Sequence, residues 1–195
     1  MIGIIDYNAG NLRSILKAVE LFDRAKIVKE EEEILSCDKI ILPGVGNFGS
    51  AMKNLKPLKN CLYKVIEEKV PFLGICLGLQ ILFERSEECL NEKGLGIIKG
   101  EVVKFKKGKI PHMGWNNVYI LKDSPIFDNI KNGEYFYFVH SYYVNPNENC
   151  VIGKTDYYVE FPSVVQKDNV IATQFHPEKS GKVGLKMLEN FIELF

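Results

Sequence analysis

The chain has 195 residues, of which 46% are hydrophobic, and its 25 basic side chains balance its 25 acidic ones. This length fits one large domain with a sizeable core, so we expect a single domain over residues 1–195. The balanced charge gives no general reason to expect nucleic acid or an anionic membrane as a partner. No apolar run approaches the ~20 residues that span a bilayer, and residues 1–6 lack the basic start of a signal peptide.

Short apolar runs alternate with helical patterns in the first half of the chain. Strands are predicted over residues 2–5, 25–28, 39–42 and 70–75. Helices are predicted after a cap at Asn11, over residues 55–66 with an interruption near Pro57, and after Gly78. Strands that alternate with helices in this way are typical of a parallel sheet with helices on both faces. We therefore expect an α/β fold with an open, mostly parallel sheet.

From about residue 94 the pattern changes to strands joined by short polar turns. These strands are predicted over residues 102–105, 118–121, 135–144, 164–165 and 170–175, with a tight turn over 167–169. We expect this half to extend the sheet and to add antiparallel strands. Apolar residues at helical spacing from Val183 to Phe195 predict a closing helix.

The five cysteines are odd in number, widely spaced and without a C-x-x-C pair. This pattern argues against a disulfide framework and against a zinc site, so we expect no metal and a reducing, cytoplasmic setting. Four of the thiols are expected to be small core side chains. The five are Cys37, Cys61, Cys76, Cys89 and Cys150.

One of these cysteines lies in the segment Gly74-Ile75-Cys76-Leu77-Gly78, which follows an apolar strand and precedes a helical pattern. This is the nucleophile-elbow pattern with cysteine in place of serine. The glycines allow a strand and a helix to approach closely, and the turn would expose Cys76 at the carboxyl end of the sheet. The backbone N–H of Leu77 would remain free to stabilise an oxyanion. A buried cysteine at a tight turn is the alternative reading.

A nucleophilic cysteine needs a base, and His176-Pro177-Glu178 supplies a candidate. His176 follows the predicted strand over residues 170–175, so it should also lie at a sheet edge. In extended backbone, residues two apart project to the same side, which would place Glu178 beside His176. A carboxylate there would orient the imidazole. An exposed surface turn is the alternative for this motif taken alone.

A glycine-rich segment, residues 44–49, follows a strand and matches G-x-G-x-x-G. A dinucleotide site would need an acidic residue after the next strand, but that strand ends in Cys76. We therefore prefer a loop whose backbone N–H groups help to form an oxyanion hole. A glycine turn without a ligand is the third possibility.

Together the three segments resemble those of class I glutamine amidotransferases, and more narrowly those of the glutaminase subunits of imidazole glycerol phosphate synthase. Further motifs with this resemblance are Asp6-Tyr7, Gly10–Leu12, Leu42–Gly46, Pro111–Asn116, Phe138–Tyr142 and Gln174–Ser180. They span nearly the whole chain. The chain departs from the family pattern at Asn8, at Asp156–Val159 and at Gly181, none of which touches the three segments.

The resemblance implies a flavodoxin-like fold, no cofactor, L-glutamine as substrate and a cyclase partner subunit, HisF. Cys76 would attack the glutamine carboxamide, His176 would transfer protons and Glu178 would orient His176. The implied glutamine-binding residues are Gly44, Val45, Gly46, Leu77, Gln80, Ser141 and Tyr142. The implied partner-facing residues are Asn11, Trp115, Tyr137 and Lys179. His112 and His140 are expected to be hydrogen-bonded structural residues.

Other functions remain open on the sequence. One is a paralogous subunit that supplies ammonia to a different synthetase. Another is a non-catalytic regulatory subunit on the same scaffold, although Cys76 and His176 are both retained.

Overall fold

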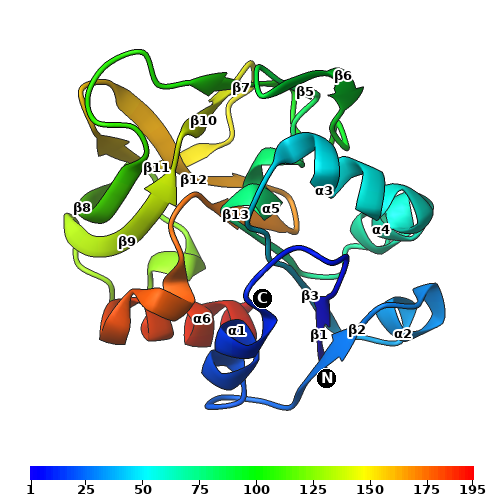
Figure 1. Ribbon diagram of the computed structural model, residues 1–195. Coiled ribbons are helices and arrows are strands. Elements are labelled where there is room, and N and C mark those ends of the chain that lie inside the picture. Colours follow the sequence, from blue (N-terminus) through cyan, green and yellow to red (C-terminus); the bar gives the residue numbers. More distant parts are fainter.

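The computed structural model describes residues 1–195, with helices around a central sheet and a second small sheet beside it (Figure 1). The helices and 3₁₀ turns are α1 (Leu12–Val19), α2 (Glu31–Leu35), α3 (Phe48–Leu55), η1 (Lys56–Leu58), α4 (Lys59–Glu67), α5 (Leu77–Gln80), η2 (Pro125–Phe127), η3 (Pro177–Lys179) and α6 (Gly181–Leu194). None of the helices combines the length and the apolar character that a membrane span requires.

The strands form two sheets. They are β1 (Ile2–Ile5), β2 (Ala25–Val28), β3 (Lys39–Leu42), β4 (Phe72–Ile75), β5 (Arg85–Ser86), β6 (Cys89–Lys93), β7 (Gly100–Lys104), β8 (His112–Ile120), β9 (Glu134–His140), β10 (Tyr142–Pro146), β11 (Val151–Asp156), β12 (Glu160–Lys167) and β13 (Val170–Thr173). The large sheet has nine strands in the order β2-β1-β3-β4-β13-β12-β11-β8-β9, and the small sheet has four in the order β10-β7-β5-β6. The first five strands of this order, β2-β1-β3-β4-β13, pair parallel with their neighbours. The strands β12, β11, β8 and β9 that follow pair antiparallel, each with the strand before it.

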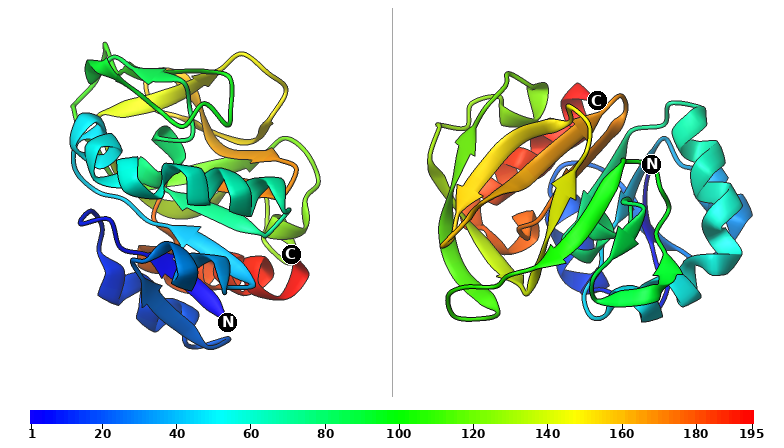
Figure 2. Two further views of the ribbon diagram at one scale, coloured as in Figure 1. Left: turned by 90° about the vertical axis from the view of Figure 1, so that its right-hand side faces the viewer. Right: turned by 90° about the horizontal axis from the view of Figure 1, so that it is seen from above.

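The first half of the chain confirms the predicted alternation of strands and helices. Successive side chains of a strand point to opposite faces of the sheet, so they pack against different helical layers. Ile4 and Ile41 pack with α1 and α6 on one face, whereas Ile40 and Leu42 pack with α2, α3 and α4 on the other. Figure 2 shows these two helical layers on either side of the large sheet. The predicted interruption near Pro57 is η1, which separates α3 from α4. Asn11 is the N-cap residue of α1, at the predicted position, but its side chain makes no capping hydrogen bond.

The second half confirms the extension of the sheet by antiparallel strands and the closing helix, but several elements differ from the prediction. The strand expected over residues 135–144 is two strands: the chain leaves the large sheet after His140 and enters the small sheet at Tyr142. The elements α2, β5, β6 and β11 and nearly all of α3 were not predicted, and β8 and β12 begin earlier than expected. Polar sequences such as that of β6 lack the apolar alternation that marks a half-buried strand.

The tight approach of α5 to the sheet explains both glycines of the predicted elbow. A Cβ at Gly78 would overlap the carbonyl oxygen of Leu42 at the end of β3. A Cβ at Gly74 would lie 2.9 Å from the carbonyl oxygen of Gly78. Only glycine fits at these two positions, so strand and helix are joined by the single residue Cys76.

A buried amide fastens the closing helix to the 3₁₀ turn η2 and to the residue that follows this turn. Nδ2 of Asn190, on α6, donates to the carbonyls of Ile126 at 3.1 Å and of Asp128 at 2.7 Å. We predict that Asn190→Ala lowers the free energy of unfolding by about 2 kcal/mol, because two hydrogen bonds are lost and two carbonyls lose a partner. Urea denaturation measures this. Glu193→Ala, at an exposed position of the same helix, is the control; an equal effect of the two substitutions would contradict the prediction.

Candidate active site

Cys76 occupies the turn between β4 and α5 in a strained backbone conformation, with φ 55° and ψ −105°. Positive φ is uncommon for any residue with a side chain, and such strain is often found at functional sites. The sulfur of Cys76 makes two weak contacts, to the carbonyl of Val139 at 3.9 Å and from Nε2 of Gln174 at 3.7 Å. The elbow thus presents the thiol to a polar surround formed by the second half of the chain.

His176 and Glu178 are paired, although not through the geometry that the sequence suggested. Nδ1 of His176 lies 2.9 Å from Oε1 of Glu178, and the two side chains are only 2% and 4% exposed. The prediction that extended backbone aligns them is wrong, because Glu178 lies in the 3₁₀ turn η3. Since the carboxylate holds Nδ1, the second nitrogen, Nε2, is left without a hydrogen-bond partner in the protein.

Opposing effects act on the charge of His176. Burial disfavours the charged imidazole, but the neighbouring Cys76 sulfur and the Glu178 carboxylate more than offset it, so the pKa of His176 is raised above its usual value. The imidazole can therefore hold a proton between the sulfur and the carboxylate. This is the charge distribution that a cysteine nucleophile with a histidine partner requires.

Ser180, the last residue of the motif over residues 174–180, had no role assigned from the sequence, and it fixes the backbone that carries His176. Its buried hydroxyl donates to the carbonyl of His176 at 2.6 Å and accepts from the backbone N–H of Tyr137 at 2.9 Å. The backbone N–H of His176 donates to the carbonyl of Tyr137 at 2.9 Å. Strand β9 therefore determines where His176 lies relative to Cys76.

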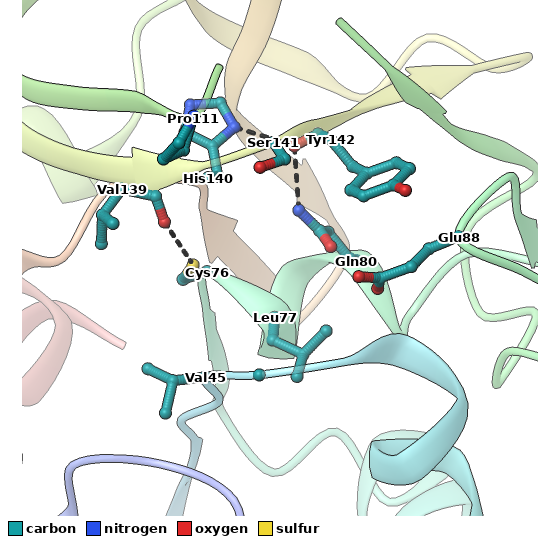
Figure 3. Close-up of a pocket in the computed structure, with 11 residues that line it drawn as sticks. Val45, Cys76, Leu77, Gln80, Glu88, Pro111, Val139, His140, Ser141 and Tyr142 are labelled. Carbon is teal, nitrogen blue, oxygen red and sulfur yellow. Dashed lines mark hydrogen bonds between the residues drawn. The ribbon is translucent and has the colours of Figure 1, made fainter.

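A cavity of about 420 Å³ opens beside Cys76 (Figure 3). Six other residues that the resemblance implied for glutamine binding line it: Val45, Gly46, Leu77, Gln80, Ser141 and Tyr142. Gly44, His176 and Glu178 are not among its lining residues. The lining also includes Glu88, Pro111, Val139 and His140, of which Glu88 is the only one that carries a carboxylate. Segments far apart in the sequence thus meet around one thiol.

Glu88 lies in the turn that joins β5 to β6 at the small sheet, and its Oε2 accepts from the backbone N–H of Phe48 at 2.7 Å. Sequence reasoning missed it because the segment from Glu84 to Glu92 contains several acidic residues with no distinguishing pattern. Only the fold brings this one to the cavity.

The backbone N–H that the elbow pattern predicted to be free is bonded to the glycine loop. The backbone N–H of Leu77 donates to the carbonyl of Gly44 at 3.3 Å, so the prediction that it stays free is wrong for this structure. The loop is held from below by the buried hydroxyl of Tyr7, which donates to the carbonyl of Pro43 at 2.8 Å. An oxyanion could take the Leu77 N–H only if the Gly44 carbonyl moved away.

Two side-chain amides connect the sulfur to the far wall of the cavity. Nε2 of Gln80 donates to the carbonyl of Tyr142 at 3.0 Å and to Oε1 of Gln174 at 3.2 Å, and Gln174 in turn donates to Cys76. Gln174 is fully buried, so its amide stays fixed against the thiol. Gln174 belongs to the motif over residues 174–180, but the sequence analysis assigned it no role in the site.

Three of the four residues implied to face a partner lie together. Trp115 on β8 pairs in register with Tyr137 on β9, and their rings meet edge to face at 6.2 Å. Trp115 is 56% exposed. Lys179 lies beside them in η3, and Asn11 is exposed just before α1, which packs against η3.

No group of three histidine, cysteine, aspartate or glutamate side chains could hold a metal ion.

Comparisons with known proteins agree with this geometry. The family model of the class-I glutamine amidotransferases matches residues 3–194. The imidazole glycerol phosphate synthase subunit HisH of Methanocaldococcus jannaschii is 71% identical over 195 residues, covering 100% of both chains. The subunit HisH 1 of Methanococcus maripaludis is 61% identical over 203 residues, again with 100% of both chains covered.

Solved structures share the fold at low sequence identity. A structure of PurLQS from Thermotoga maritima aligns with a TM-score of 0.79 at 20% identity, covering 99% of this chain and 97% of that one. A glutamine amidotransferase crystal structure aligns with a TM-score of 0.78 at 19% identity and the same coverage. The chain belongs to the class-I glutamine amidotransferase family and, within it, to the HisH group.

Proposed function

We propose that this chain is the glutaminase subunit of an imidazole glycerol phosphate synthase, in which it hydrolyses L-glutamine to glutamate and ammonia. The observation that carries the proposal is the strained Cys76 beside the His176–Glu178 pair, at the mouth of a cavity of amino-acid size. The family and the full-length similarity to HisH subunits support the same function. Residues 1–195 act as one amidotransferase domain.

In the reaction, Sγ of Cys76 attacks the carboxamide carbon of glutamine. His176 takes the thiol proton and donates it to the leaving nitrogen, so that ammonia departs and a glutamyl thioester remains. Water then transfers a proton to Nε2 of His176 and attacks the thioester, which releases glutamate and restores the thiol. Glu178 holds Nδ1 of His176 throughout, and this keeps Nε2 directed at the reacting atoms.

The cavity wall opposite Cys76 recognises the amino-acid end of glutamine. Glu88 is the carboxylate that faces the cavity, and we assign it to the α-ammonium group of the substrate. Ser141 and Tyr142 bind the same end, while Gln80 holds the Tyr142 carbonyl in place. Val45, Gly46 and Leu77 lie on the other side, near the reacting carboxamide.

The glycine loop determines whether an oxyanion can be stabilised. The N–H of Leu77 is the oxyanion donor, with the backbone of Gly44 to Gly46 completing the hole. The hydrogen bond from Leu77 to Gly44 means that the donor is occupied in the resting chain. A change in the loop is therefore part of activation.

The partner is the cyclase subunit HisF, which takes up the ammonia that this chain releases. Support comes from the exposed ring of Trp115 against the half-buried ring of Tyr137, whose backbone carbonyl accepts from the N–H of His176. Aromatic side chains on an exposed strand are enriched at protein interfaces. Asn11 lies towards the same face. The heterodimer acts in histidine biosynthesis in the cytoplasm.

We predict that Cys76→Ala abolishes glutamine hydrolysis without loss of folding, because only the nucleophile is removed. The assay is ammonia release from glutamine by the heterodimer with the cyclase subunit of the same organism. Cys89→Ala, which removes a thiol outside the cavity lining, should retain full activity. Release of ammonia at the wild-type rate by Cys76→Ala would show that the nucleophile is wrongly assigned.

Glu88→Gln is predicted to raise the KM for glutamine by about 10-fold to 100-fold with a smaller change in kcat, since a charged hydrogen bond to the substrate contributes about 1.5–3 kcal/mol. Steady-state kinetics of the heterodimer measure both constants. Glu87→Gln is the matched control, because Glu87 accepts from the backbone N–H of Lys104 instead of lining the cavity. A KM that is unaffected by Glu88→Gln would exclude Glu88 from ammonium binding.

The isolated chain is predicted to hydrolyse glutamine slowly, because the Leu77 N–H is occupied by Gly44. Binding of the cyclase subunit together with imidazole glycerol phosphate should stimulate the rate by about 100-fold or more, the effect of one oxyanion donor. Ammonia release with and without the partner measures this stimulation. Full activity of the chain alone would refute the occupied-donor explanation.

A further inference from the structure

Two buried histidines outside the His176–Glu178 pair are joined directly to each other. His112 on β8 and His140 on β9 are register partners, 3% and 6% exposed, with Nδ1 of His112 at 2.9 Å from Nε2 of His140. An imidazole pair in a core requires that one ring donates and the other accepts. The partners of the two remaining ring nitrogens, Nδ1 of His140 and Nε2 of His112, determine which ring donates.

On the His140 side of the pair, a backbone carbonyl fixes the position of the proton. Nδ1 of His140 lies 2.8 Å from the carbonyl oxygen of Tyr142, which can only accept, so Nδ1 carries the proton. Burial lowers the pKa of His140 to about 3, which leaves the ring neutral. Its Nε2 is therefore an acceptor, and Nδ1 of His112 must donate to it.

On the His112 side of the pair, Asn116 supplies the donor to the free ring nitrogen. Burial lowers the pKa of His112 to about 4, so its Nε2 is also an acceptor, and Nδ2 of Asn116 donates to it at 3.2 Å. The same Nδ2 donates to the carbonyl of Asp156 at 2.9 Å, and Oδ1 of Asn116 accepts from the N–H of Asn117 at 2.8 Å. Every polar atom of this amide is used, so its orientation is fixed.

These contacts form one chain of hydrogen bonds with a single direction, from Asn116 through His112 and His140 to the carbonyl of Tyr142. The carbonyl where it ends also accepts from Gln80, so two donors hold it (Figure 3). At this point β9 ends, and the polypeptide crosses at Ser141 from the large sheet to the small one. Ser141 and Tyr142 both line the cavity.

Packing alone does not require this pair. His140 lies among aromatic rings, with Phe105 at 5.3 Å, Phe161 at 5.2 Å and Phe138 at 5.7 Å between centroids. An apolar ring would fill the same space without the cost of burying two imidazoles. What an apolar ring cannot do is donate to the Tyr142 carbonyl at the crossing.

We propose that His112 and His140 are positioning residues for the glutamine pocket: their hydrogen-bond chain fixes the Ser141–Tyr142 crossing against which the substrate binds. The proposal rests on the proposed glutaminase function of the cavity. His140 makes the contact, and His112 selects the form of His140 that can donate. Asn116 in turn orients His112.

The first test is nitrogen NMR of the uniformly ¹⁵N-labelled wild-type chain at neutral pH. Both buried imidazoles should be neutral and protonated at Nδ1, which is the less common form of histidine in water. A proton at Nε2 of either ring, or two protons on one ring, would overturn the proposed direction. This test needs no catalysis, so it stands even if the chain proves to lack glutaminase activity.

The second test compares two substitutions at His140 in the heterodimer. His140→Leu removes the donor and should raise the KM for glutamine by about 10-fold with a smaller effect on kcat, the effect of roughly one hydrogen bond. His140→Asn keeps an N–H near the position of Nδ1 and should recover most of the affinity. Equal KM values for the two variants, or an unchanged KM for His140→Leu, would overturn the proposal; if His140→Leu does not fold, the NMR result decides.

Discussion

The contact between α5 and the carbonyl end of β3 is the constraint on which the site depends. Because Gly78 lies against the Leu42 carbonyl, the chain has room for only one residue between strand and helix. That residue, Cys76, must take a positive φ, and its side chain is directed away from the layer of α3 and α4. The loop after β3 lies beside it for the same reason, so that Gly44 can accept from Leu77. Cys76 and the glycine loop are therefore placed by a single packing contact.

The two halves of the chain supply different parts of the site. The parallel half provides a rigid turn that holds the thiol at the edge of the sheet. The second half of the chain provides His176, the paired carboxylate of Glu178 and five of the eleven residues that line the cavity, and β9 connects these parts through the backbone of Tyr137. A residue on β9 can consequently influence both the base and the pocket. The aromatic surface proposed for the partner belongs to the same strand pair, which puts a partner in contact with both.

Local sequence patterns correctly predicted the features whose geometry depends on one short segment of the chain. The strands β1 and β4 contain no polar side chain and β2 and β3 contain one lysine each, and the glycines at 74 and 78 mark the elbow because sterics there exclude other residues. Features that depend on distant contacts were missed or wrong. The break at Ser141 carries no turn signal, because the sequence on both sides is aromatic and apolar. The polar strand β6 and the residue Glu88 acquire their places only from pairing within the small sheet.

On the proposed assignment of Glu88 to the ammonium group, the spacing of the two sheets sets the length of amino acid that the pocket accepts. Cys76 directly follows a strand of the large sheet, whereas Glu88 lies in the turn between two strands of the small sheet, so the placement of the two sheets sets the separation between them. An amino acid held at Glu88 by its ammonium group reaches the sulfur only if its side chain has the right number of methylenes. Asparagine, one methylene shorter than glutamine, would stop short of Cys76 once its ammonium is bound. Selection by length therefore requires no group dedicated to rejecting asparagine, since the spacing of the two sheets performs it.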